Sequence, residues 1–382
     1  MGCYNLIMSF FSNFFAKKEE GSVLGIDIGS SAIKIVQLRK KNGQAILETY
    51  GELALGPYSN ATVGQATMLP PEKVASALKD LMKEKEVNIT TRKCGISIPF
   101  TSSLLSVIEL PQVSSKQLAT MVPLEARKYI PVPISEVMLD WSVIPKTEIR
   151  MEDNPNPPAG GEVKEGSNIP KIDVMIVAIH NDTIARYKTI VAGAGLDASF
   201  FEIEIFSTMR AVLDEALAPV MIMDLGAAST KLYIVERGVI RASHTINRGS
   251  QDITQTLSKS LNLPIEKAEV MKRTIGLLGT DQSFTDVIVL TMDYIFSEAN
   301  RALLSFEKKY NKTVSKVILV GGGAALKGLP DIAKKNFNTE AVAGNPFGKV
   351  ATPAFLEKVL NETGPEFAVA IGLALRELQE QE

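Results

Sequence analysis

The chain has 382 residues, of which 45% are hydrophobic and 22% are charged, a composition typical of a folded protein long enough for two or more domains. Its 41 basic and 43 acidic side chains give a net charge of −2, so no electrostatic argument favours binding to nucleic acid. The two cysteines exclude a disulfide framework and indicate a reducing compartment.

The N-terminal tail of residues 1–20 is the first distinct segment. It contains an apolar stretch from Leu6 to Phe15, whose phenylalanines could form one face of a short helix that touches a membrane or a partner. A tail without defined structure is the alternative, and we adopt it. No apolar run in the sequence reaches the roughly 18 residues that a transmembrane helix needs.

Two segments of similar sequence each predict a strand, a turn of small residues and a second strand. They run from Val23 to Val36 and from Val220 to Val235, and β-branched and aliphatic residues flank both turns. At the same offsets, Asp27, Gly29 and Lys34 correspond to Asp224, Gly226 and Lys231. This repeat predicts two similar half-molecules, each beginning with its own hairpin.

The remaining elements alternate between strands and helices, which places the chain in the α/β class. We expect helices at residues 71–85, 114–130, 182–194, 205–217, 253–261, 265–274, 287–310, 330–337 and 365–379. We expect strands at residues 94–98, 104–110, 137–144, 172–179 and 314–320. Residues 148–170 are rich in Pro, Gly, Asn and acidic side chains, which predicts a mobile loop.

A strand that ends in Asp-x-Gly and a small-residue turn is suited to a phosphate ligand. The carboxylate can hold a hydrated metal ion, and the turn presents backbone amides to phosphate oxygens. One such turn indicates little, because Asp and Gly are ordinary hairpin residues. Two turns in the same register could close on one triphosphate from opposite sides, which favours the functional interpretation.

A glycine-rich turn follows the strand expected at residues 314–320. The sequence Gly321-Gly322-Gly323-Ala324 fits neither a Walker A loop nor a dinucleotide fingerprint, because Leu329 and Leu326 stand at positions that those motifs reserve for other residues. Three glycines allow a flat ligand to lie against the backbone. A tight turn from strand to helix without a ligand is the alternative.

These three segments resemble the two phosphate motifs and the adenosine motif of the actin, Hsp70 and sugar-kinase superfamily. The resemblance implies an α/β, actin-like fold with two ribonuclease H-like domains around a cleft that binds ATP and Mg²⁺. It implies metal coordination by Asp27 and Asp224. It also implies nucleotide contacts from Gly29, Ser30, Ser31, Lys34, Gly226, Ala227, Ala228, Gly321, Gly322, Gly323 and Ala324.

Two further segments resemble functional parts of the same superfamily. Residues 201–207 resemble its first connecting helix, which implies a catalytic role for Glu204, beside Asp27 and Asp224, in orienting water; Glu202 is expected on the same strand face, so this choice depends on the motif. Residues 268–272 resemble the pair that binds ribose through Glu269 and covers adenine through Lys272. A surface ion pair is the alternative for Glu269 and Lys272.

Residues 366–374 resemble the second connecting helix, whose small side chains pack at the hinge. Lys34 and Lys231 occupy alternating strand positions, so both could also be surface lysines. We favour a phosphate contact for Lys34 and leave the role of Lys231 open.

A narrower resemblance is carried by the segment from Tyr129 to Pro133 and by Leu139-Asp140-Trp141. Together with residues 195–196 and 201–211, they are similar to the PilM family of type IV pilus assembly proteins, which is related to the cell-division protein FtsA. This resemblance implies an FtsA-type inserted subdomain at about residues 111–192. The first domain would then span residues 21–218 and the second residues 219–382.

The same resemblance implies a cytoplasmic protein, peripheral to the inner membrane, that serves the pilus assembly platform. Its partner would be the N-terminal cytoplasmic peptide of a PilN-like membrane protein, and other pilus assembly proteins are further candidates. The expected groove lies between the insert and the first core subdomain, where Leu104 to Leu110 would offer a strand edge and Tyr129 to Val132 apolar surface. Packing of the insert onto the core is the alternative for these residues.

Weak Mg²⁺-dependent ATP hydrolysis and the absence of turnover are both compatible with this resemblance. An FtsA-like filament protein and a small-molecule kinase are the alternative functions. Against the first, the acidic end from Arg376 to Glu382 is unsuited to anionic lipid. Against the second, the sequence contains no motif for a sugar or acid pocket.

Overall fold

The computed structural model describes residues 21–144, 170–214 and 218–380. The described chain divides into two compact units: a smaller unit of residues 101–185, and a larger unit of residues 21–100 and 186–380. The tail of residues 1–20 and nearly all of the loop predicted at residues 148–170 lie outside the described residues. The expected bounds of the insert and of the two domains stay predictions.

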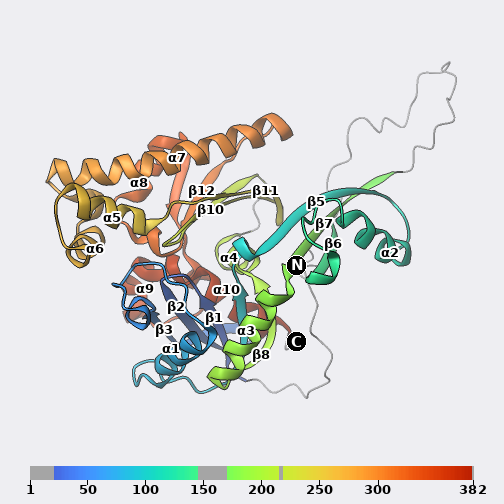
Figure 1. The fold of residues 1–382 in the computed structure, drawn as a ribbon, viewed down its shortest axis with the longest axis horizontal. Helices are drawn as coiled ribbons and strands as arrows, with labels where there is room; N and C mark the ends of the chain where they lie inside the picture. Colours follow the sequence, from blue (N-terminus) through green and yellow to red (C-terminus); the bar gives the residue numbers. More distant parts are fainter. Residues whose placement is uncertain (1–20, 145–169, 215–217, 381–382) are drawn as a thin grey trace. The chain divides into compact units, whose positions relative to one another are not determined.

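The larger unit contains two five-stranded sheets of the same topology, β3-β2-β1-β4-β8 and β11-β10-β9-β12-β13 (Figure 1). In each, three strands form an antiparallel meander and two more continue the sheet in parallel. The first sheet comprises β1 (Val23–Ile28), β2 (Ala32–Lys41), β3 (Gln44–Ala54), β4 (Lys93–Ile98) and β8 (Asp197–Ile203). The second comprises β9 (Val220–Leu225), β10 (Thr230–Glu236), β11 (Val239–Ile246), β12 (Lys316–Val320) and β13 (Glu340–Ala343). The duplication that the repeated hairpin predicts is confirmed.

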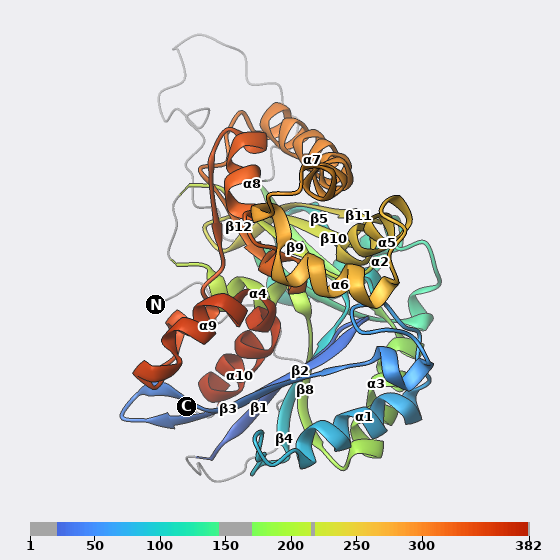
Figure 2. The same ribbon diagram turned by 90° about the vertical axis from the view of Figure 1, so that its left-hand side faces the viewer.

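Helices cover both faces of the first sheet (Figure 2). α1 (Pro71–Lys83) packs on β3, where Leu81 approaches Gly51, and α3 (Asn181–Ala194) packs beside α1. On the other face, α4 (Glu204–Val212) and α10 (Ala368–Glu380) cross each other. At their crossing an ideal Cβ on Gly372 would collide with the Ser207 carbonyl oxygen, so the helices touch through their backbones. This close packing agrees with the small residues of the predicted hinge.

The second sheet is covered by α5 (Ser250–Ser260), α6 (Ile265–Thr274), α7 (Gln282–Tyr310) and α8 (Leu329–Phe337). One hydrophobic cluster joins its strands to these helices, with Phe284, Met292 and Phe296 of α7 fully buried. Helix α7 begins five residues earlier than the sequence predicts, because Asp281 caps it by accepting hydrogen bonds from the amides of Ser283 and Phe284. The remaining helix, α9 (Glu357–Thr363), precedes the 3₁₀ turn Gly364–Phe367.

The smaller unit is an antiparallel sheet of order β5-β7-β6 packed against one helix. Its elements are β5 (Ser103–Pro111), α2 (Ser115–Ala126), β6 (Val137–Ile144) and β7 (Lys171–His180). Ser114 and Gln117 form a capping box that starts α2. The helix ends at Ala126, four residues before the predicted end, and its core residues Leu118 and Val122 pack against the sheet.

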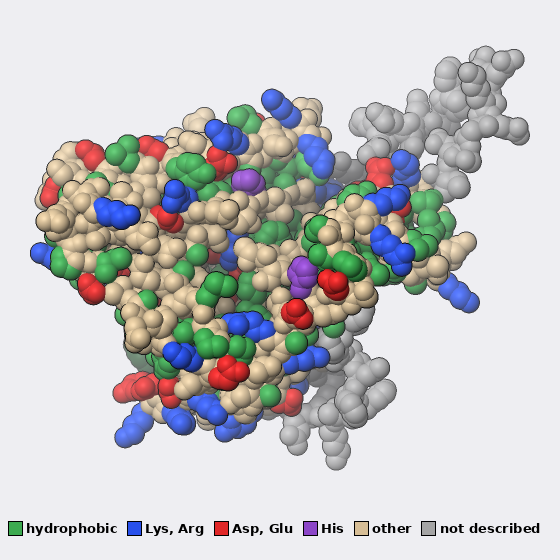
Figure 3. Space-filling view, viewed as in Figure 1, with side chains coloured by type: hydrophobic (Ala, Val, Ile, Leu, Met, Phe, Trp, Pro, Cys, Tyr) green, Lys and Arg blue, Asp and Glu red, His purple; other side chains and the backbone are tan. Residues whose placement is uncertain are grey.

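The described helices and the face shown in Figure 3 can be compared with what a membrane-spanning or strongly charged protein requires. Among the helices that the structure describes, none has both the length and the apolar character that crossing a bilayer requires. On the face shown in Figure 3, basic and acidic side chains are interspersed, in keeping with the net charge of −2.

Candidate functional site

A cavity of about 230 Å³ within the larger unit is lined by residues from both sheets. Nearly all of the site residues expected from the sequence line it: Asp27, Gly29, Ser30, Ser31, Lys34, Glu204, Asp224, Gly226, Ala227, Ala228, Glu269, Lys272, Gly321, Gly322 and Gly323. Ala324 is not among the lining residues, because it packs in the hydrophobic core, and Ala325 lines the wall instead. The structure thus gathers these residues at one place, while their individual roles stay predictions.

The two hairpin turns have the same local geometry. The amide of Gly29 donates a 3.0 Å hydrogen bond to the Ala32 carbonyl, and the amide of Gly226 donates one of 3.0 Å to the Ser229 carbonyl. In each hairpin the aspartate is paired in register with the lysine, Asp27 with Lys34 and Asp224 with Lys231. Each turn therefore offers one carboxylate, one cation and a short run of small residues to the cavity.

Asp27, the penultimate residue of β1, lines the cavity. The Ser97 hydroxyl on β4 donates a 2.8 Å hydrogen bond to its Oδ1 atom. Burial raises the pKa of Asp27, and the opposing effects of Lys34 and Ser97 do not cancel that increase. A cation placed beside this carboxylate would therefore favour its ionised form.

Asp224, Lys231 and Glu204 form a buried charge cluster on the opposite side. The Lys231 ammonium lies 2.7 Å from Glu204 Oε1 and 3.3 Å from Asp224 Oδ2. The Phe100 amide also donates a 2.6 Å hydrogen bond to Glu204 Oε1. Burial lowers the pKa of Lys231, but Asp224 and Glu204 more than reverse this effect, so Lys231 remains cationic. The interpretation of Lys231 as a surface lysine is therefore wrong.

Glu204 itself differs from the expectation in its local structure. Glu202 lies in β8, but the chain turns at Ile203 and Glu204 is the first residue of α4. The prediction that both glutamates share one strand face is therefore wrong, because the change from strand to helix sends their side chains in different directions. Burial raises the pKa of Glu204, and Lys231 only partly offsets it.

Lys34 contacts two carboxylates that the sequence did not single out. Its ammonium lies 3.4 Å from Glu52 Oε1 and 3.9 Å from Glu366 Oε2, and both glutamates line the cavity. Burial raises the pKa of Glu366 to about 7, with Glu52 adding to the increase and Lys34 opposing it. Lys34 is only 8% exposed, so it too is not a surface lysine. Glu52 pairs in register with Lys34 on β3, a strand that we did not predict.

Glu269 and Lys272 are buried rather than exposed at the surface. They are 4% and 7% exposed, and the Lys272 ammonium lies 2.7 Å from Glu269 Oε2. Thr254 donates a hydrogen bond to the same oxygen, and Arg273 donates one of 2.7 Å to Oε1. Burial lowers the pKa of Lys272, whereas the cations and hydroxyl around Glu269 lower its pKa against the effect of burial. The alternative of a surface ion pair is wrong.

The glycine turn after β12 forms a wall made of backbone. An ideal Cβ on Gly321 would collide with Asp224 Oδ1, and one on Gly323 would lie 2.7 Å from the Leu225 Cβ. The Gly321 amide donates a 2.9 Å hydrogen bond to the Pro365 carbonyl, which holds the turn beside the segment leading into α10. A side chain at residue 321 would therefore displace Asp224, and one at residue 323 would displace Leu225, the last residue of β9.

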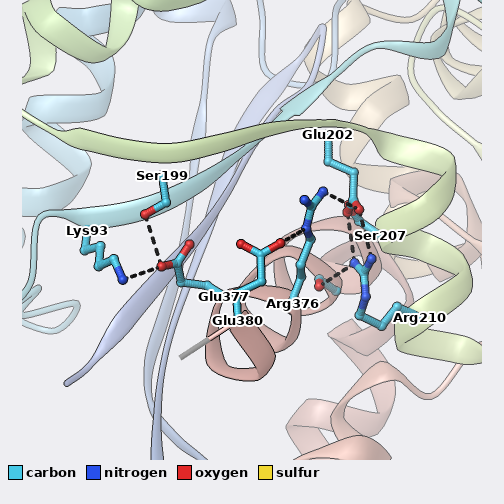
Figure 4. A network of polar contacts seen from close by, with 9 residues as sticks. Lys93, Ser199, Glu202, Ser207, Arg210, Arg376, Glu377 and Glu380 are labelled. Atoms are coloured by element: carbon cyan, nitrogen blue, oxygen red, sulfur yellow. Dashed lines mark hydrogen bonds and ion pairs between the residues drawn. The ribbon is translucent and has the colours of Figure 1, made fainter. Parts of the chain in front are cut away.

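A buried ionic network around Glu202 was missed by sequence reasoning (Figure 4). Glu202 accepts hydrogen bonds from Arg210 on α4, Arg376 on α10 and Ser207. Although burial alone would raise it, these partners hold the pKa of Glu202 at about 2. Arg210 also donates a 2.9 Å hydrogen bond to the Gly372 carbonyl. The network therefore joins the two crossing helices directly behind Glu204.

The donor set fits a magnesium–nucleotide ligand better than a metal ion alone. Within the described residues, no cluster of three or more His, Cys, Asp or Glu side chains is arranged to hold a metal ion. Mg²⁺ is usually held by one or two carboxylates together with phosphate oxygens and water. Asp27 and Asp224 on the two turns, with Lys34 nearby, meet that requirement.

Comparison with known proteins identifies the family. The family described as "Type IV pilus assembly protein PilM" matches residues 25–378. The chain belongs to the PilM family of type IV pilus assembly proteins. A solved structure of a PilM–PilN type IV pilus biogenesis complex is 27% identical, covers 95% of this chain and 99% of that chain, and superposes with a TM-score of 0.75.

More distant relatives show the fold. MreB 5 of Spiroplasma citri, solved bound to AMPPNP, is 11% identical with a TM-score of 0.50, covering 95% of this chain and 98% of that chain. The cell division protein FtsA of Neisseria meningitidis is 24% identical over 213 residues, 48% of this chain and 51% of the relative. The chain thus spans about half the length of the curated relatives that it matches. The predicted actin-like fold and the resemblance to PilM are confirmed.

Proposed function

We propose that the chain is the ATP-binding, cytoplasmic component of a type IV pilus inner-membrane platform, peripheral to that membrane, and that it binds the N-terminal peptide of a PilN-like protein. The observation that carries this proposal is the match to the PilM–PilN complex over 95% of this chain and 99% of that chain. The cavity supports the nucleotide part independently, because it combines two phosphate-type turns with paired carboxylates and lysines.

Each group in the cavity has a proposed role toward ATP and Mg²⁺. Asp27 and Asp224 would hold the metal, which supplies positive charge to neutralise the phosphates. Lys34 and the turn residues Ser30, Ser31, Ala227 and Ala228 would bind phosphate oxygens. Glu269 and Lys272 would bind the ribose and cover the adenine, and the glycine turn would admit the flat base.

The ion pairs inside the cavity predict how this binding changes the protein. Lys34 shares Glu52 and Glu366, and Lys231 shares Glu204 and Asp224. A phosphate group would therefore compete with carboxylates for each lysine. Because the ligand touches both sheets, binding would favour the closed arrangement of the two halves and act as a conformational clamp.

Hydrolysis would require Glu204 to orient water, and its current contacts argue for slow turnover. Its carboxylate is occupied by Lys231 and by the Phe100 amide. Both contacts involve the same oxygen, Oε1, and Lys231 offsets the negative charge with which the carboxylate would polarise a water molecule. We therefore propose a scaffold whose main nucleotide function is binding, with weak Mg²⁺-dependent hydrolysis at most.

The peptide part of the proposal is supported by the smaller unit. β5 is an edge strand of its sheet, so its outer edge can pair with an extended peptide. Val107 on β5 is 41% exposed and Tyr129 is 44% exposed. Ile130, by contrast, is buried in the core of this unit, so it is removed from the candidate contact surface.

A binding experiment tests both parts. A fluorescent peptide from the neighbouring PilN-like protein should bind the full chain saturably, and Val107→Arg should weaken that binding while Ser142→Arg, on the opposite edge strand β6, should not. ATP binding is measured by calorimetry on the same samples. If ATP binds but the peptide does not, the partner is wrong and the nucleotide proposal stands; if neither binds, both fail.

A further inference from the structure

A strap of residues 61–69 connects the two halves of the larger unit. It leaves the 3₁₀ turn Gly56–Ser59 and enters α1, so both of its ends belong to the first half. Thr67 fastens it to the first hairpin turn, because its amide and hydroxyl donate hydrogen bonds of 2.8 and 3.1 Å to the Ser30 carbonyl. The C-terminal part of the strap is thus fastened beside the turn predicted to bind phosphate.

The middle of the strap is fastened to the second half. The Ala66 amide donates a 3.0 Å hydrogen bond to Gln251 Oε1, and Gln255 donates one of 3.3 Å to Gln65 Oε1. Gln251 and Gln255 belong to α5, which lies above the strap in Figure 2. A peptide segment of the first half is therefore held by side chains of the second half.

The strap also forms part of the cavity wall. Gly64 lines the cavity with a φ of +86°, and an ideal Cβ at this position would collide with the Glu269 carboxylate. Within the described residues, Thr62 Oγ1 and Gln65 Nε2 are buried without a hydrogen-bond partner. The strap therefore brings Gly64 to the side of the cavity where Glu269 lies, and it carries two buried polar atoms that have no partner among the described residues.

We propose that the strap of residues 61–69 is a clasp over the nucleotide cleft and that Gln251 is the residue that fastens it. This inference rests on the proposed nucleotide binding. A ligand bound against Glu269 would lie beside Gly64, so its release would be coupled to the release of α5 by the strap. Two neutral hydrogen bonds join the strap to α5, the shorter of them from Ala66 to Gln251. Each contributes little net stability, so the clasp opens and closes readily.

The test measures ligand release and strap opening separately on the full chain. Radiolabelled AMPPNP is bound with Mg²⁺ and chased with excess unlabelled AMPPNP, and hydrogen exchange is followed over residues 61–69 without ligand. Gln251→Ala should raise the dissociation rate about threefold to tenfold, the effect of one hydrogen bond, and should speed exchange in the strap. Gln282→Ala is the matched control, because the Gln282 side chain donates a hydrogen bond within α7, to Asp286, and not to the strap.

A conservative variant separates fastening from general structural damage. Gln251→Glu keeps an acceptor oxygen for the Ala66 amide, so the strap should exchange as slowly as in the parent. If the parent binds AMPPNP and Gln251→Ala releases it at the parental rate, the clasp is wrong while nucleotide binding stands. If hydrogen exchange over residues 61–69 is equally fast in Gln251→Ala and in the parent, Gln251 does not fasten the strap. A parent that binds no AMPPNP overturns the nucleotide proposal and the clasp with it.

Discussion

Lys34 and Lys231 occupy the same position in the two hairpins, yet they are held differently. Lys34 lies 3.4 and 3.9 Å from glutamates supplied by β3 and by the segment before α10. Lys231 lies 2.7 Å from Glu204 and 3.3 Å from Asp224, the aspartate of its own hairpin. The duplicated backbone therefore specifies where each lysine stands, and the neighbouring elements decide how free it is to bind a ligand.

The largest expected effect is a difference in stability between variants that lack one or the other lysine. Lys231→Met should lower the free energy of unfolding by about 3 kcal/mol, because it leaves Glu204 and Asp224 buried without their cation. Lys34→Met should cost about 1 kcal/mol, because its ion pairs are longer and Glu366 can take up a proton. Urea denaturation at pH 7 measures both; equal losses would contradict the comparison.

The two aspartates, unlike the lysines, should behave alike. Asp27→Ala and Asp224→Ala should each reduce the affinity for MgATP by about a hundredfold, or about 2.7 kcal/mol, because each removes a proposed metal ligand. Calorimetry on variants whose circular dichroism matches the parent provides the measurement. Asp331→Ala, on α8 away from the cavity, is the control. If both variants bind MgATP with the same affinity as the parent, the cavity is not the nucleotide site.

Burial raises the pKa of Glu204, beside Lys231, and also that of its counterpart beside Lys34, Glu366. Its pKa is raised from 4.5 to about 7 on folding, so the folded protein binds this proton more tightly than the unfolded chain. The stability contributed by the protonated form is complete below about pH 4.5 and is lost as the pH rises to about 7. Its magnitude is about 2 kcal/mol, discounted for solvent screening.

Glu366→Gln should remove that slope. The difference in unfolding free energy between parent and variant is measured in urea at several values between pH 4.5 and pH 7. Glu362→Gln, a nearby glutamate on α9, provides the matched control. A parent-minus-variant difference that stays constant across this interval would show that Glu366 does not titrate there.

The smallest expected effect concerns Glu204. Glu204→Gln should change the ATP affinity less than about threefold but slow phosphate release by about tenfold, because orienting water contributes in the transition state. Affinity and phosphate release are measured side by side on the same preparation. If the variant hydrolyses ATP as fast as the parent, another group orients the water.

Local sequence patterns predicted the parts of the fold that depend on neighbouring residues. The two hairpins are such parts, because an aspartate, a glycine and a lysine at fixed offsets define each turn. The glycine turn after β12 is another. The pattern also placed Asp27, Asp224 and Gly321 at one cavity through the resemblance to a known fold, and all three line it.

Contacts between distant segments could not be predicted from the sequence. Glu52 reaches Lys34 only because β3 pairs with β2, and a register shift between Gln37 and Leu38 precludes a simple count from the turn. Gln251 lies 185 residues from Ala66, its partner in the strap. The relative orientation of Glu202 and Glu204 was predicted wrongly for a different reason. The strand ends between them, and the alternation of side chains ends with it.

Gly372 has a consequence for the shape of the cavity. An ideal Cβ at this position would collide with the Ser207 carbonyl oxygen, so α10 and α4 approach this closely only with glycine here. Arg210 and Arg376, both hydrogen-bonded to Glu202, hold the same two helices together. Gly372→Ala, one of the smallest possible substitutions, would therefore force α10 away from α4 and shift Val369, which lies one helical turn earlier in the cavity wall.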